Sequence, residues 1–173
     1  MRALADAERI RSFMRALGAE AAEDGAVYFT GGATAVLLGW RASTLDVDIL
    51  PIPEQDSVLR AVAHLKDELQ VNVELASPRD FIPVPAGWED RSLFVAREGR
   101  LSFYHFDPYA QALAKVERGH SQDLEDVRAL VERGLVDPQR ALRFLDEIED
   151  QLYRYPALDA AAFRRRAKAA LAR

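Results

Sequence analysis

The sequence contains no cysteine and only three histidines among its 173 residues. The lack of cysteine excludes disulfide bonds, a thiol nucleophile and any cysteine-ligated zinc or iron–sulfur site. The chain also lacks an apolar run of the ~20 residues that span a bilayer, and charges interrupt its N-terminal segment where a signal peptide has an apolar core. The sequence therefore predicts a soluble, cytoplasmic protein that has no membrane partner.

An excess of positive charge is absent as well. Lysine and arginine together number 23, aspartate and glutamate 28, and the net charge is −5. This balance does not predict a general polyanion binder and leaves only local basic patches for nucleic acid. One such patch is the run Arg164-Arg165-Arg166 with Lys168, which is equally typical of a solvated helix end.

Hydrophobic spacing divides the first 77 residues into alternating helices and strands. Apolar residues three and four positions apart predict helices, and short alternating or β-branched runs predict strands. The expected helices are 4–23, 33–39 and 57–69, the last capped by Asp56, and the expected strands are 26–29, 45–50 and 71–75. In the last strand, Val71, Val73 and Leu75 are expected on the core face.

The remainder of the chain predicts a hairpin followed by helices. Prolines and glycine predict a loop over 78–92, and the hairpin strands are expected at 93–96 and 101–106. The expected helices are 108–118, 123–133, 138–153 and 160–172. We therefore predict an α/β (α+β) domain over 1–107, with a mixed sheet flanked by helices, and a small C-terminal helical bundle over 108–173.

Two aspartates in the second predicted strand form the first candidate site. Successive strand side chains alternate between faces, so Asp46 and Asp48 share one surface, about 6–7 Å apart at Cα, while Val47 and Ile49 face the core. Like charges at this range repel, and a divalent cation between them removes that penalty. Hard oxygen ligands favour Mg²⁺ or Mn²⁺.

A third carboxylate and a glycine pair extend this site. Glu74 lies on the polar face of its own strand, and if that strand lies beside the Asp46–Asp48 strand, three acids converge. Such a set can hold two metals, an arrangement that stabilises the attacking and leaving oxygens of phosphoryl transfer. Gly31 and Gly32, between a strand and a helix, allow backbone N–H groups to approach a phosphate closely.

The glycine pair followed after a short helix by Asp46-Val47-Asp48 resembles the nucleotidyltransferase motif of the DNA-polymerase-β-like superfamily. Within it the chain most resembles the minimal and AbiEii-like nucleotidyltransferases, many of which are toxins of toxin–antitoxin systems. Lys115-Val116-Glu117-Arg118 followed by Asp123-Leu124-Glu125-Asp126 is similar to a helical motif of that group. The resemblance covers roughly residues 26–130 and implies a nucleotidyltransferase-like fold.

The resemblance also implies roles for single residues. Asp46, Asp48 and Glu74 would be catalytic and bind the metals, although the commoner third residue is Asp. The nucleotide-binding residues would be Thr30, Gly31, Gly32, Arg41, Thr44, Lys115 and Arg118. From their spacing alone, Lys115 and Arg118 are equally expected to pair with nearby acids. His105 is expected to be a packed or hydrogen-bonded ring rather than a base.

The implied function is metal-dependent transfer of a nucleoside monophosphate from a nucleoside triphosphate to a hydroxyl acceptor, either RNA (tRNA) or protein. A toxin of this kind would have a cognate antitoxin protein. Two alternatives remain at this point: a catalytically silent module of the same fold that binds a nucleotide or a partner, and an antibiotic nucleotidyltransferase.

Overall fold

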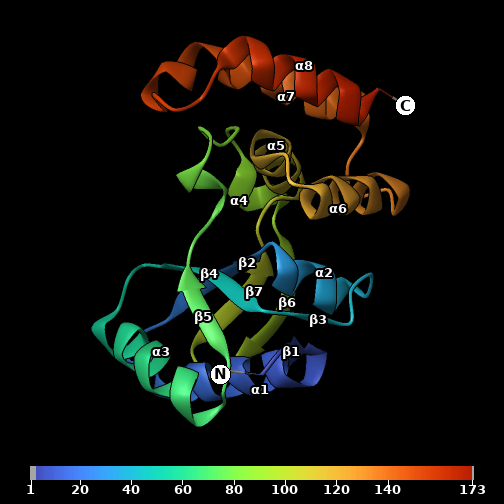
Figure 1. The fold of residues 1–173 in the computed structure, drawn as a ribbon. Coiled ribbons are helices and arrows are strands. Elements are labelled where there is room, and N and C mark those ends of the chain that lie inside the picture. The colour runs from blue at the N-terminus through green and yellow to red at the C-terminus, as the bar shows by residue number, and fades with distance from the viewer. Residues whose placement is uncertain (1–2, 173) are drawn as a thin grey trace. The chain divides into compact units, whose positions relative to one another are not determined.

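The computed structural model describes residues 3–172 and divides the chain into two compact units (Figure 1). The first unit comprises Met1–Ser77 and Leu93–His105, and the second comprises Pro78–Ser92 and Phe106–Arg173. Residues 78–92, expected as a loop of the N-terminal domain, thus belong to the second unit. The predicted fold class is confirmed, because helices flank a mixed sheet in the first unit and the C-terminal part is helical.

The first unit is built on a five-stranded sheet of order β5-β4-β2-β7-β6. Its strands are β2 (Gly25–Thr30), β4 (Asp46–Ile52), β5 (Asn72–Leu75), β6 (Leu93–Glu98) and β7 (Leu101–His105). The β4 strand runs antiparallel to β2 and parallel to β5, and β2 is parallel to β7. A two-stranded ladder joins β1 (Ala5–Asp6) to β3 (Ser43–Thr44).

Three helices cover one face of this sheet: α1 (Ala7–Glu20), α2 (Gly32–Leu38) and α3 (Asp56–Glu68). Figure 1 shows α1 and α3 on the same side of the strands. Their apolar residues at helical spacing, Phe13 and Leu17 among them, join Val27, Phe29 and Val47 in one buried cluster. Removing this surface from water is the main stabilising contribution in the unit.

Three local expectations in the first unit are wrong. The helix expected over 4–23 begins only at Ala7, because Ala5–Asp6 form strand β1. The N-cap position of helix α3 is Gln55, whose side chain makes no capping bond, and Asp56 is instead the first helical residue and places its negative charge at the positive end of the helix dipole. Leu75 is 55% exposed, because β5 is an edge strand and its contribution to the core ends at Val73.

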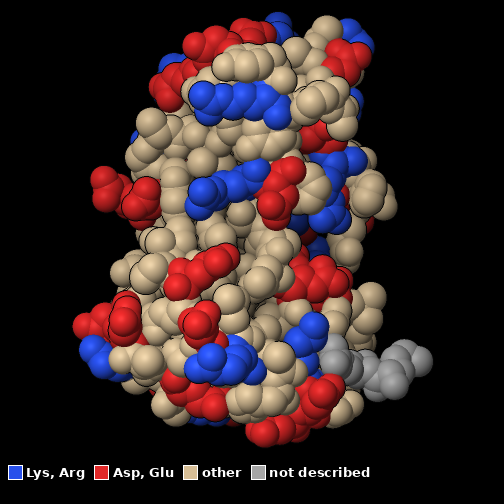
Figure 2. All heavy atoms as spheres, turned by 90° about the vertical axis from the view of Figure 1, so that its left-hand side faces the viewer, with Lys and Arg blue, Asp and Glu red and all other residues tan. Residues whose placement is uncertain are grey.

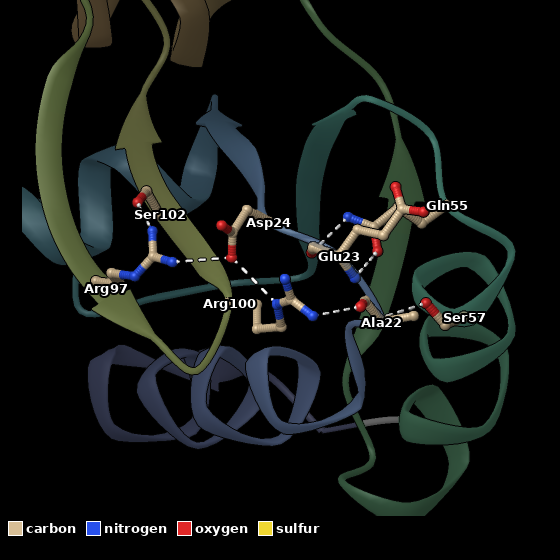
Figure 3. A network of polar contacts seen from close by, with 8 residues as sticks. All are labelled: Ala22, Glu23, Asp24, Gln55, Ser57, Arg97, Arg100 and Ser102. Carbon is tan, nitrogen blue, oxygen red and sulfur yellow. Dashed lines mark hydrogen bonds and ion pairs between the residues drawn. The ribbon is translucent and has the colours of Figure 1, made fainter.

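A polar network fastens the α1–β2 connection to the rest of the first unit (Figure 3). Asp24 accepts hydrogen bonds from Arg97 and Arg100 of the β6–β7 hairpin. These partners hold the pKa of Asp24 below its usual value, with the hydrogen bond from Arg100 as the largest cause. Gln55 bonds both backbone groups of Glu23: its Oε1 accepts from the amide at 3.0 Å and its Nε2 donates to the carbonyl at 2.9 Å.

The second unit is helical. Its helices are α4 (Trp88–Arg91), α5 (Pro108–Arg118), α6 (Ser121–Glu132), α7 (Pro138–Ile148) and α8 (Ala160–Leu171), with 3-10 turns at η1 (Pro78–Asp80) and η2 (Glu149–Arg154). The α5 helix packs against α6, α7 and α8, and residues 108–116 are buried on every side of it. The helix expected over 138–153 ends at Ile148, and the chain continues as the 3-10 turn η2.

The segment 78–92 packs on the helices of its own unit. The Trp88 ring stacks on Phe106 with centroids 4.3 Å apart. Arg91 pairs with the fully buried Asp107 at 2.9 Å and lies over the Phe144 ring. Burial raises the pKa of Asp107, and the hydrogen bond and charge of Arg91 oppose that rise.

Within residues 3–172, no helix is long and apolar enough to cross a bilayer.

The two bonds from Gln55 to Glu23 predict a stability effect. Replacing Gln55 by Ala leaves a backbone donor and a backbone acceptor of a partly buried turn without these partners, so the free energy of unfolding should fall by about 1–3 kcal/mol. Urea unfolding measures this change. The control is Asp24→Ala, whose solvent-exposed ion pairs contribute little. Equal effects of the two substitutions would contradict the assignment.

Candidate functional site

Strand β4 brings the predicted acidic residues together. Its side chains alternate strictly, with Val47 and Ile49 fully buried and Asp46 and Asp48 on the opposite face. Asp48 is registered opposite Thr30 of β2 on one side and opposite Glu74 of β5 on the other. Registered partners share a face of the sheet, so these side chains form one row. One oxygen of Asp48, Oδ1, is buried, whereas Glu74 is exposed.

The glycine pair forms the turn beside this row. Gly31 has φ +64°, a conformation that favours glycine, and a Cβ there would lie 3.3 Å from Oδ2 of Asp48. A Cβ on Gly32 would lie 2.0 Å from Oγ1 of Thr44. Thr44 in turn donates to the backbone carbonyl of Asp46 at 3.0 Å. The absence of two side chains therefore lets the backbone of the turn approach the Asp48 carboxylate and the Thr44 side chain.

The remaining predicted nucleotide-binding residues are distributed over both units. Thr30 ends β2 and is buried, and Arg41 is half-buried in the connection between α2 and β3. Lys115 and Arg118 belong to α5 of the second unit. The structure thus groups the acids with Thr30, the glycines and Thr44 within the first unit.

Asn72 belongs to this site although the sequence did not single it out. It is registered opposite Asp46, and its amide nitrogen donates to Asp46 Oδ1 and, at 3.4 Å, to Glu74 Oε1. The alternation of 71–75 placed Asn72 and Glu74 on one face, which is the signal that identifies it. Its amide links two of the three carboxylates.

The donor set fits a hard divalent cation by its chemistry. Within residues 3–172, no three His, Asp or Glu side chains are arranged to hold a metal as they stand. Mg²⁺, however, is usually bound by one or two carboxylates together with substrate phosphates and water, and not by a complete protein cage. Asp46 and Asp48 supply such a pair, and Glu74 is the nearest further carboxylate in the register.

His105 is buried behind the glycine turn. It ends β7 beside Phe29, is 4% exposed, and its Nδ1 lies 3.0 Å from Oγ1 of Thr34 in α2. Burial lowers the pKa of His105 from 6.5 to about 4, so the ring is neutral at pH 7. The prediction of a packed, hydrogen-bonded ring is confirmed, and its bond to Thr34 ties β7 to the first turn of α2.

In the second unit, Lys115 joins two acids of α6. Its Nζ lies 2.8 Å from Asp126 Oδ2 and 3.6 Å from Asp123 Oδ1, and the side chains of all three residues are buried. Arg118 pairs with Asp123 from the exposed side. The two halves of the helical motif noted in the sequence therefore contact each other and fasten α5 to α6.

On the face shown in Figure 2, the described residues form no extended basic field. Lysine and arginine are interspersed with aspartate and glutamate over the face shown in Figure 2. In the basic run of α8, Arg164 pairs with Asp146 and Glu149, and Arg166 pairs with Glu117. Two of the three consecutive arginines are therefore neutralised within the unit.

The lowered pKa of His105 predicts a pH dependence of stability. Below pH 6.5 the His105 ring of the unfolded chain binds a proton, whereas the buried ring of the folded protein takes one up only near pH 4. The contribution of the neutral ring to folding stability is therefore complete above pH 6.5 and is lost as the pH falls from 6.5 to 4. His105→Asn removes it. The stability loss between pH 7 and pH 5 should be about 2 kcal/mol smaller in the variant, measured by denaturant unfolding. Parallel profiles would contradict the burial of a neutral ring.

The Lys115 cluster predicts a double-mutant effect. Lys115→Met leaves buried Asp126 without its ammonium partner and should lower the free energy of unfolding by about 3–5 kcal/mol. Lys115→Met combined with Asp126→Leu should recover most of this loss, because the unpaired charge is gone. Denaturant unfolding of both variants provides the measurement. A fully stable Lys115→Met protein with impaired nucleotide binding would instead show that Lys115 acts on a ligand.

Comparison with known proteins identifies one matching family. No curated protein and no solved structure shows significant similarity to the chain. A protein family described as "Nucleotidyltransferase of unknown function (DUF6036)" matches residues 7–160. This match extends over most of the chain and includes the glycine turn, β4, β5 and helices α1 to α7. The chain therefore belongs to the DUF6036 family of nucleotidyltransferases of unknown function.

Proposed function

We propose that the protein transfers a nucleoside monophosphate from a nucleoside triphosphate to a hydroxyl acceptor and releases pyrophosphate. The observation that carries this proposal is the register that sets Asp48 between Thr30 and Glu74, directly beside Gly31. It combines carboxylates suited to a cation with a glycine turn whose backbone lies close to Asp48. Family membership supports the same reaction class.

The acidic residues differ in environment and would have different roles. Asp46 and Asp48 would hold Mg²⁺ or Mn²⁺, which when bound neutralises the charge that develops on the transferred phosphoryl group. Glu74 is exposed and registered next to Asp48, so it is suited to accept the proton of the attacking hydroxyl. Asn72 would orient the carboxylates of Asp46 and Glu74 through its amide.

The backbone and the polar side chains around the turn would position the triphosphate. The backbone amides at Gly31 and Gly32 would bind phosphate oxygens, and Thr30, Thr44 and Arg41 would be further ligands of the nucleotide. Lys115 and Arg118 remain predicted nucleotide ligands. To reach a phosphate, Lys115 would have to leave Asp126.

The acceptor that we propose is RNA (tRNA) or a protein in the cytoplasm, and the biological role that we propose is that of an AbiEii-like toxin with a cognate antitoxin. Purified protein is incubated with each radiolabelled nucleoside triphosphate, Mg²⁺ and total RNA or cell lysate. A labelled RNA or protein band identifies donor and acceptor together. A neighbouring gene that encodes a small protein binding this chain would support the toxin role.

A catalytically silent nucleotide-binding module is the second candidate. The observation that favours it is the side-chain arrangement, in which Asn72 links Asp46 and Glu74 and no three-ligand group is formed within the described part of the chain. Calorimetry with Mg²⁺ and each nucleoside triphosphate separates the candidates. Tight, metal-dependent binding without turnover would favour the silent module.

Asp46→Asn provides the sharpest test of the catalytic assignment. The substitution preserves the shape of the side chain but removes its charge, so the transfer rate should fall by a factor of about 10²–10⁴ while stability changes little. The matched control is Asp67→Asn on the exposed surface of α3. Initial rates of label transfer at saturating Mg²⁺ give the comparison. An Asp46→Asn protein with full activity would refute the assignment.

A further inference from the structure

A row of large apolar side chains lies next to the acidic row on the same face of the sheet. Register pairs Tyr28 with Leu50 of β4 on one side and with Tyr104 of β7 on the other, and pairs Tyr104 with Phe94 of β6. Thr30, two residues from Tyr28 along β2, belongs to the row of Asp48. The two rows are therefore adjacent, about 7 Å apart along the strands.

The aromatic rings of this row contact one another in sequence. Tyr28 and Tyr104 are stacked, with centroids 5.3 Å apart and an interplanar angle of 21°. Phe94 meets Tyr104 edge-on, with centroids 5.7 Å apart. Exposure increases toward the sheet edge, from buried Tyr28 through half-buried Tyr104 to Phe94, which is 62% exposed. The buried ring thus supports an exposed one.

A β-bulge determines the position of Phe94. The register of β6 with β7 shifts between Phe94 and Ala96, so Val95 is the additional residue. Without this shift, alternation along β6 would not place Phe94 opposite Tyr104, on the face of the sheet that carries the acidic row. Bulges of this kind commonly redirect a side chain near a functional site. The core of the unit lies on the other face of the sheet, so it does not explain an exposed phenylalanine there.

We infer that Phe94 and Tyr104 form a stacking site for a nucleobase of the acceptor, which makes a single-stranded nucleic acid the substrate class. The inference rests on the proposed transferase function. An exposed aromatic surface that is supported by a buried ring and lies on the same face of the sheet as the carboxylates matches the chemistry of single-strand binding, in which bases stack on aromatic side chains. A protein acceptor offers no base for this surface.

The distance between the carboxylates and Phe94 favours a base of the acceptor strand, and not the base of the donor nucleotide, as the group that stacks on Phe94. Asp48 and Phe94 lie on strands three positions apart in the sheet, a lateral separation of about 14 Å. At about 3.4 Å per stacked nucleotide, that distance corresponds to about four nucleotides. An acceptor end bound at the carboxylates would therefore extend its preceding bases across Tyr104 toward Phe94.

Binding of a fluorescently labelled, eight-nucleotide single-stranded RNA in the presence of Mg²⁺ tests this inference. The comparison probe has the same phosphates but abasic sites. Stacking predicts that wild-type protein binds the normal RNA about 5–100 times more tightly than the abasic one, and that Phe94→Ala loses most of this difference. Phe94→Trp should retain it. Phe94→Leu, which keeps an apolar side chain, should lose it.

The matched control is Tyr153→Ala, which removes an aromatic ring of the second unit that is 76% exposed. Equal affinity of Phe94→Ala and wild type for the normal RNA, an equal effect of Tyr153→Ala, or no binding of RNA by wild type would overturn the inference. A Phe94-dependent affinity for nucleoside triphosphates without one for RNA would assign the ring to the donor base and overturn the acceptor assignment. Circular dichroism verifies that each variant is folded.

The binding assay does not require turnover, so it separates this inference from the proposed function. Base-dependent RNA binding that depends on Phe94, together with no label transfer to any acceptor, would refute the transferase and retain the stacking site. Label transfer to a protein with no effect of Phe94→Ala would retain the transferase and refute the stacking site.

Discussion

The pairing of β4 with its two neighbours is the constraint on which the candidate site depends. The strand has a side-chain period of two, and its buried residues Val47 and Ile49 fix which face meets the core. A slip of one residue would bury Asp46 and Asp48 and expose their apolar neighbours, at a prohibitive desolvation cost. Hydrophobic burial on one face therefore fixes the positions of the carboxylates on the other, although they contribute nothing to the core.

The two units accommodate buried ionisable groups in different ways. The sheet unit keeps His105 neutral, because burial removes the hydration that a charged ring needs and Thr34 supplies a hydrogen bond that requires no charge. The helical unit instead keeps charges and pairs them, as Lys115 does with Asp126 and Arg91 with Asp107. Paired charges impose geometry on the helices that carry them, whereas a neutral ring allows ordinary close packing.

Much of the fold followed from the sequence because its signals are local. Alternation in 45–50 and helical spacing in 108–118 predicted elements close to those observed, and alternation also placed Glu74 on the polar face of β5. Strand pairing is not a local property, so the sequence alone did not show that β5 lies beside β4. The register of the two strands shows it. The contact of His105 with Thr34 and the bulge beside Phe94 depend on tertiary packing and on register, neither of which has a pattern in one segment.

Residues 78–92 belong to the second unit, so the chain cannot be divided into its two units at one position. The backbone passes between the units three times, after Ser77, Ser92 and His105, so neither unit is a continuous stretch of sequence. A fragment that stops at 107 would retain Trp88 and Arg91 but lose the helix that carries Phe144. Dissecting the protein genetically thus calls for a circular permutation or an internal deletion with a bridging linker, since no single truncation point yields an intact half.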